Sequence, residues 1–125
     1  MNLQTALDRV DIHRPNHVNE TQKIAWLNEL DGQINKELVM THYHRCDEFQ
    51  FRGYDDSTEG DTVLLAPFPY DEIYFYYLCS QVDNVNQEIE KYNNDRELFN
   101  NSYKLLSDYI NRTYMPVQRS RQFRI

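Results

Sequence analysis

Apolar residues recur at helical spacing over four stretches of this chain, and this periodicity limits its possible folds more than any other feature. Residues that are three, four and seven positions apart lie on one face of an α-helix. The first stretch has this spacing at Leu3, Ala6, Leu7 and Val10. The pattern predicts a mainly α fold, a small bundle of about four helices. The expected core of the three later stretches comprises Leu27, Leu30, Ile34, Leu38, Leu78, Val82, Val85, Ile89, Phe99, Tyr103, Leu106 and Ile110.

Particular residues indicate where these helices begin and end. Pro15 disfavours helical geometry in the residue before it, so we expect the first helix to end near Arg14. Asn19 has a side chain suited to capping the start of the second helix. Asp71 and Glu72 are expected in the first turn of the third helix, where the helix dipole favours acidic groups.

Two positions inside the helical stretches leave alternatives open. Gly32 weakens the second helix by about 1 kcal/mol relative to alanine, and it indicates either a close crossing of another segment or exposure to solvent. Residues 93–95, Asn-Asn-Asp, either end the third helix and cap the fourth, or form a polar patch on one long helix.

Residues 43–69 lose the helical period and form a long non-helical excursion. Residues 48–52 alternate between polar and aromatic side chains, and residues 62–65 are β-prone, so the two runs could form a short β-hairpin around an acidic tip. A loop of this length in a small domain usually has a function. We therefore predict that the excursion contacts a partner, through Phe49, Phe51 and Phe68.

Charge is unevenly distributed along what we expect to be one domain of residues 1–125. The chain carries 20 acidic and 13 basic residues, and every acid lies at or before Asp108. Residues 112–125 contain four arginines and no acid, whereas the other nine basic residues and all 20 acids precede them. The net charge of −7 disfavours nonspecific binding to nucleic acid. The asymmetry indicates a tail that binds an acidic surface.

The basic tail, residues 115–125, combines charge with apolar anchors. Arginine is suited to bidentate contact with carboxylates, and a phenylalanine can fill a pocket. We expect the tail to bind an acidic groove on a partner or on a neighbouring copy, and the alternative is contact with DNA phosphates. The predicted binding residues are Arg119, Arg121, Phe123, Arg124 and Ile125.

No motif in the chain indicates catalysis or a bound cofactor. His42, His44 and Cys46 are close in sequence, but a structural zinc site needs four ligands, so a polar helix end explains them better. The acidic loop does not match an EF-hand, because the twelfth position counted from Asp55 is an alanine. Cys79 lies on an apolar helix and is expected to be buried. We therefore expect no enzyme, no metal and no cofactor.

Ten tyrosines are many for a chain of this size, and eight of them lie between residues 70 and 114. A tyrosine joins a large apolar ring to a polar hydroxyl group, so it suits a core whose rings reach solvent and also suits a partly wet interface. The sequence leaves these two interpretations open.

No apolar run approaches the roughly 20 residues that a membrane-spanning helix needs. The first residues also lack the basic and then apolar pattern of a signal peptide. We therefore expect synthesis in the cytoplasm and no membrane partner.

Several short motifs stand out along the chain: residues 6–10, 26–32, 70–74, 90–94, 99–100 and 109–116. Together they resemble the head–tail connector subunits (head-completion or adaptor proteins) of tailed phages and prophages, and the similarity covers most of the chain. The resemblance implies a helical core, a ring of roughly a dozen copies, and an elongated tail or loop that grips neighbours.

The resemblance also implies a function. Such a subunit binds beneath the portal protein, contacts neighbouring copies in a dodecameric ring and a tail or stopper protein, and leaves a channel through which DNA passes without sequence-specific binding. An acidic body suits such a channel, because it repels phosphate. The expected location is the head–tail junction of the virion, after synthesis in the host bacterial cytoplasm. The alternative is a small helical protein-binding regulator without catalytic activity, and a metal-assisted enzyme is a third hypothesis.

Overall fold

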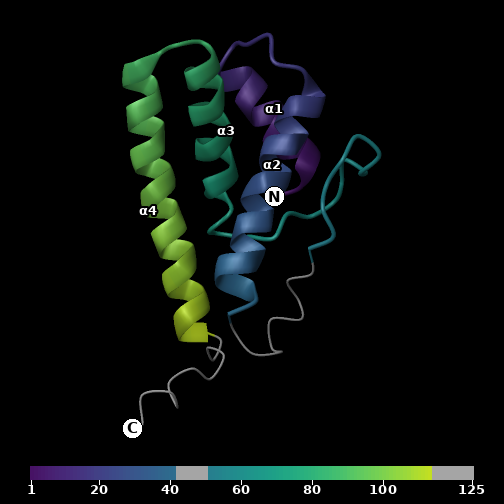
Figure 1. Cartoon of the computed structure of the whole chain (residues 1–125), viewed down its shortest axis with the longest axis vertical. Coiled ribbons are helices and arrows are strands. Elements are labelled where there is room, and N and C mark those ends of the chain that lie inside the picture. The colour runs from purple at the N-terminus through teal and green to yellow at the C-terminus, as the bar shows by residue number, and fades with distance from the viewer. Residues whose placement is uncertain (42–50, 114–125) are drawn as a thin grey trace, which may run out of the picture.

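The computed structural model describes residues 1–41 and 51–113, and over these residues it contains four α-helices and one π-helical segment (Figure 1). No β-strand forms within this described part of the chain. The predicted mainly α fold of about four helices is therefore confirmed. The elements are α1 (Leu3–His13), α2 (Glu20–Ile34), the π-helix η1 (Asn35–Val39), α3 (Glu72–Val85) and α4 (Ile89–Thr113).

Helix α3 lies at the centre of the bundle. It runs along α4 on one side and packs against α1 and α2 on the other (Figure 1). A short turn joins α3 to α4, which run in opposite directions, and η1 continues α2 towards the C-terminal end of α4. The guanidinium of Arg9 on α1 donates two hydrogen bonds, of 2.7 and 3.1 Å, to the carboxylate of Glu72 at the start of α3.

Helices α1 and α2 begin at residues whose side chains cap them. The side-chain oxygen of Asn2 accepts a hydrogen bond from the backbone N–H of Thr5, and that of Asn19 accepts one from Gln22, so each asparagine caps a helix. Helix α1 ends at His13, one residue before the expected boundary at Arg14. The predicted cap at Asn19 is confirmed.

Most residues that were predicted to form the core are buried, but two of them are exposed. Val85 is 53% exposed and Ile89 is 71% exposed, so their assignment to the core was wrong. Tyr103 is partly buried and packs against the core. The remaining nine predicted residues are buried: Leu27, Leu30, Ile34, Leu38, Leu78, Val82, Phe99, Leu106 and Ile110.

The error at Val85 and Ile89 comes from a turn that the apolar pattern does not reveal. Helix α3 ends at Val85, and Gln87 takes a positive φ of 59° that reverses the chain. The backbone N–H of Glu88 then donates to the carbonyl of Asp83 at 2.9 Å. The break therefore lies at residues 86–88, and residues 93–95 lie inside α4, so neither alternative considered for them is correct.

Candidate interaction surface

A buried carboxylate fixes the described part of the excursion against the bundle. Asp31 on α2 is fully buried, and it accepts hydrogen bonds from the hydroxyls of Tyr54 (2.5 Å) and Tyr74 (2.6 Å) and from the backbone N–H of Leu65 (3.1 Å). The Tyr74 hydroxyl in turn accepts from the N–H of Ala66 at 2.6 Å. Burial raises the pKa of Asp31, while these hydrogen bonds act in the opposite direction.

The second half of the excursion pairs with the N-terminal residues. The N–H groups of Leu3 and Gln4 donate to the carbonyls of Thr62 and Gly60, both at 2.9 Å. The first N–H groups of a helix have no partner inside it, so these carbonyls complete the start of α1. Val63 forms one isolated antiparallel bridge, with Asn2, in place of the expected hairpin.

The three phenylalanines predicted to bind a partner differ in their surroundings. The ring of Phe51 is partly buried, lies edge-on to Tyr54 at 5.3 Å, and passes 3.8 Å from where a Cβ of Gly32 would stand. A side chain at position 32 would therefore make ordinary van der Waals contact with Phe51, so this crossing does not require glycine. Phe51 packs within its own chain. Phe68 is 85% exposed and is accessible to a partner. Phe49 lies outside the described residues.

An aromatic and basic cluster lies near the C-terminal end of α4. The rings of Tyr70 and Tyr109 stack at 4.7 Å, and Arg112 lies 5.8 Å from the Tyr109 ring. Nη2 of Arg112 also donates a hydrogen bond of 2.9 Å to the Tyr70 hydroxyl. Phe68, two positions before Tyr70 in the sequence, is exposed. We call Tyr70, Tyr109 and Arg112 the aromatic cluster. Sequence reasoning missed it, although the many tyrosines after residue 70 were a signal.

The aromatic cluster lies towards the end of the bundle where η1 and α4 both terminate (Figure 1). The Tyr103 hydroxyl of α4 donates a 2.5 Å hydrogen bond to Glu37 of η1, which joins the two elements there. The described chain stops at Thr41 on one side and at Thr113 on the other. The excursion and the tail, which carry the predicted binding residues, therefore both continue from helices that end at this end of the bundle. The tail residues Arg119, Arg121, Phe123, Arg124 and Ile125 lie outside the described residues.

The opposite end of the bundle carries a buried charge cluster. The Arg14 guanidinium bridges two carboxylates, with 3.1 Å from Nε to Asp83 and 3.1 Å from Nη2 to Asp95. Oδ2 of Asp83 is buried without a hydrogen-bond partner. Burial and the adjacent Asp95 carboxyl raise the pKa of Asp83 to about 7. This cluster joins the end of α1 to α3 and α4.

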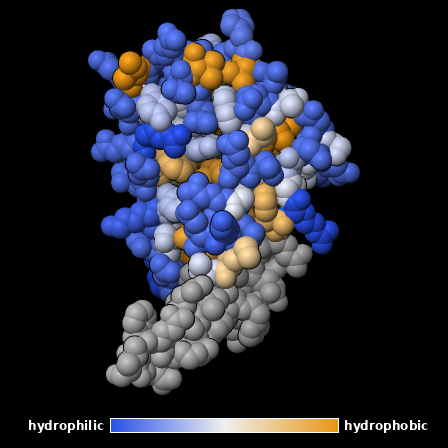
Figure 2. Space-filling model, viewed as in Figure 1, coloured by the Kyte–Doolittle hydropathy of each residue, from blue (hydrophilic) through white to orange (hydrophobic). Residues whose placement is uncertain are grey.

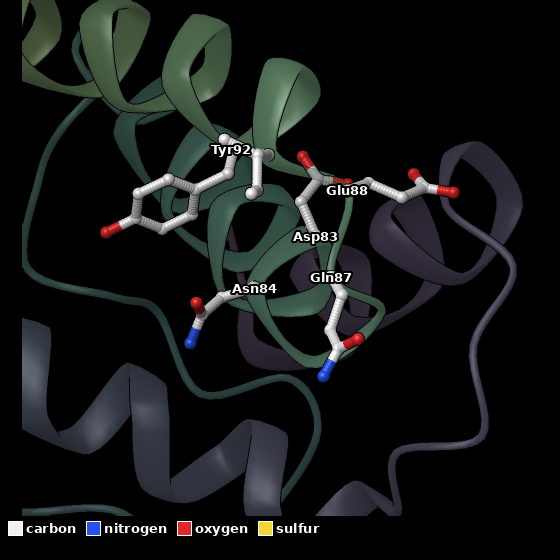
Figure 3. Close-up of a pocket in the computed structure, with 6 residues that line it drawn as sticks. Asp83, Asn84, Gln87, Glu88 and Tyr92 are labelled. Carbon is white, nitrogen blue, oxygen red and sulfur yellow. The ribbon is translucent and has the colours of Figure 1, made fainter.

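A small pocket lies beside this charge cluster, at the α3–α4 turn. Its volume is about 40 Å³, which is room for little more than water. The view in Figure 2 shows a largely hydrophilic face with some apolar atoms gathered at the end of the bundle that carries this turn. The pocket is too small to serve as a substrate cleft. It is lined by Asp83, Asn84, Gln87, Glu88, Ile89 and Tyr92 (Figure 3).

Neither a metal-holding group of side chains nor a membrane-spanning helix is found among residues 1–41 and 51–113. In those ranges no group of three or more His, Cys, Asp or Glu side chains is arranged to hold a metal ion, and no helix combines the length and apolarity needed to cross a membrane. Cys79 is buried as expected, and burial raises its pKa to about 12. His42, His44 and Cys46 lie outside those ranges.

No family model matches the chain, and comparisons with curated proteins and with solved structures find no match either.

Proposed function

We propose that the protein is a structural subunit of a phage head–tail connector ring, which binds beneath the portal protein and leaves a channel for DNA. The observation that carries this proposal is that η1 and α4, from which the excursion and the tail continue, end at the same end of the bundle. The aromatic cluster lies towards the same end. Its stacked tyrosines and arginine, together with the exposed Phe68 two positions before Tyr70, have the composition of an interface core.

The residues that carry the resemblance to connector subunits support the proposal, because several of them hold the bundle together. Asp71 belongs to the motif of residues 70–74 and directly precedes α3. Its carboxylate forms a 2.8 Å ion pair with the Met1 amino group. Trp26 is buried in the core, and Tyr109 stacks on Tyr70. A family that shares these marks would share this architecture.

The acidic charge of the body also suits the proposed ring. The acidic body would repel the phosphates of DNA that passes through the channel, so the DNA would not adhere to the subunits. The proposed partners are the portal protein, neighbouring copies and a tail or stopper protein. The proposed location is the head–tail junction of the virion.

The test is to mix the purified full-length protein with the portal protein of the same phage genome. Negative-stain imaging and native mass spectrometry should show a ring of roughly a dozen copies on the portal. Phe68→Ala should weaken this binding at least tenfold, whereas Ile12→Ala, at an exposed residue of α1, should leave it unchanged. A dimer that does not bind portal would contradict the connector proposal and favour the helical regulator.

A further inference from the structure

A groove opens between the first turns of α2 and the chain at residues 54–56. Its volume is about 190 Å³, which is enough for a side chain of a docked segment. The lining is apolar on one side and acidic on the other: it comprises Thr21, Ile24, Ala25, Tyr54, Asp55 and Asp56.

The walls of this groove are fixed before anything binds. The Tyr54 hydroxyl donates to the buried Asp31, and the Tyr54 N–H donates to Oδ1 of Asn28 at 2.9 Å. On the other side, the Thr21 hydroxyl donates to Oδ2 of Asp56 at 3.1 Å. Because both walls are held by hydrogen bonds, a ligand would bind without first ordering the groove.

The rim of the groove selects a basic ligand. Asp55 and Asp56 line the groove and are exposed. The exposed Glu59 and Asp61 follow them in the sequence, and Arg52 is the single basic residue between positions 51 and 66. Hydrogen bonds from Ser57 lower the pKa of Asp55, so its carboxylate is ionised at neutral pH. An occupant that complements this groove carries several positive charges and at least one apolar side chain.

The chain itself supplies a segment of this composition. Residues 114–125 contain Arg119, Arg121 and Arg124, the apolar Phe123 and Ile125, and no acid. We infer that this tail docks in the groove of a neighbouring copy, with an apolar side chain on Ile24 and Tyr54 and the arginines on the acidic rim. Arginine is suited to this contact because its guanidinium donates two parallel hydrogen bonds to a carboxylate.

The placement of the two surfaces favours a neighbouring copy over the same chain. Helix α4 ends at the lower left of the molecule in Figure 1, whereas the chain around residues 55–61 projects from the opposite flank, beside the start of α2. A contact between two different surfaces on opposite flanks is heterologous, and repetition of such a contact closes into a ring when the rotation permits. The inference rests on the proposed ring and supplies the contact that would close it.

The test measures binding of a fluorescein-labelled peptide of residues 114–125 to the full-length protein. The receptor carries Arg119→Glu, Arg121→Glu and Arg124→Glu, which removes competition by the tails of other receptor molecules. Fluorescence anisotropy should show saturable binding that weakens at least tenfold when the receptor also carries Asp55→Asn and Asp56→Asn. The control receptor carries Glu97→Gln and Asp108→Asn, two exposed acids of α4, and should bind as the parent does.

Circular dichroism of each receptor shows whether it is folded. Absence of saturable binding to a folded parent receptor would overturn the inference, as would equal affinity for the groove variant and the control. Binding of the peptide to DNA or to portal alone, with none to the parent receptor, would overturn it in favour of those partners.

The outcome is independent of the portal experiment. A ring that forms on portal with the groove variant as well as with the wild type would overturn the tail–groove contact and leave the connector proposal intact. Peptide binding together with failure of the wild type to bind portal would overturn the connector proposal alone.

Discussion

At the scale of single residues, the molecule uses buried carboxylates to join segments that are far apart in sequence. Asp31 receives donors from Tyr54 and Leu65 of the excursion and from Tyr74 of α3. Burial of an ionised group is costly unless hydrogen bonds compensate for the lost water. Three donors, two of them at 2.6 Å or less, provide that compensation, so Asp31 positions the excursion.

Replacement of this carboxylate should therefore destabilise the whole fold. Asp31→Ala leaves two buried donors, from Leu65 and Tyr74, and the partly buried Tyr54 hydroxyl without an acceptor. Each buried donor without a partner costs roughly 1–3 kcal/mol. We expect the free energy of unfolding in urea to fall by at least about 3 kcal/mol. Glu97→Ala, at an exposed position of α4, should leave it unchanged. An Asp31→Ala variant as stable as the Glu97→Ala control would show that the hydrogen bonds do not hold the excursion.

The second buried carboxylate, Asp83, should make stability depend on pH. Its folded pKa of about 7 lies above the ordinary value, so the protonated form is favoured in the folded state. The resulting stabilisation is complete below the ordinary carboxyl pKa and is lost as the pH rises through about 7. Asn cannot ionise, so Asp83→Asn should gain roughly 1–3 kcal/mol relative to wild type between pH 5 and pH 8. Urea denaturation at both pH values measures this, and parallel behaviour of the two proteins would refute the raised pKa.

At the scale of elements, the helices follow from local pattern and the turn between α3 and α4 does not. Helical spacing and the cap at Asn19 were sufficient to predict α1, α2 and the body of α3. The spacing continues without interruption from Val82 through Val85 to Ile89, so it gives no sign of a break. The break depends on the positive φ of Gln87, a conformation that its residue type does not indicate.

Because α3 ends at Val85, two nearby valines that the sequence pattern treats alike differ in burial. Val82 is fully buried, so Val82→Asp should bury an uncompensated carboxylate and destabilise the fold by several kcal/mol, on the order of 3 or more. Val85 is exposed, so Val85→Asp should change stability by less than about 1 kcal/mol. Thermal melts of the two variants provide the comparison. Equal losses would show that α3 continues past Val85.

The excursion offers a second matched pair of substitutions. Phe51 packs on Gly32 and Tyr54, so Phe51→Ala should lower the free energy of unfolding by about 1–3 kcal/mol through lost packing. Phe68 is exposed, and Phe68→Ala should leave stability within about 0.5 kcal/mol of wild type. Differential scanning calorimetry distinguishes the two. A large loss for Phe68→Ala would mean that its ring supports the fold and is not a binding residue.

At the scale of the whole molecule, the path of the excursion could not be read from the sequence. Its anchors are separated by many positions: Tyr54 is 23 residues from Asp31, and Tyr74 is 43 residues from it. The spacing of apolar residues depends only on residues that are close in sequence. It therefore suggested a local hairpin for the excursion, whereas Val63 instead pairs with Asn2 near the N-terminus. The aromatic cluster joins Tyr70 to Tyr109 and was hidden for the same reason.

The tail provides a prediction for the assembled molecule. A chain that ends at Met115 should keep the helical circular-dichroism spectrum, because all described helices end before that residue. It should lose binding to portal in pull-down assays, and raising the salt concentration should weaken binding of the intact chain, since the tail acts through charge. Full affinity of the truncated protein for portal, in the absence of DNA, would contradict a role for the tail in assembly.

The π-helix η1 has a consequence for how such a chain can change during evolution. The N–H of Met40 donates to the carbonyl of Asn35 at 2.8 Å, five residues back, so this turn holds one residue more than an α-helix would. An α-helix rotates by about 100° per residue. Loss of a single codon here would restore the α-helical spacing and turn the chain that leaves at Thr41 by roughly that angle. One small deletion would thus change the direction in which the chain leaves η1, while the contacts of Tyr54 and Leu65 with Asp31 stay in place.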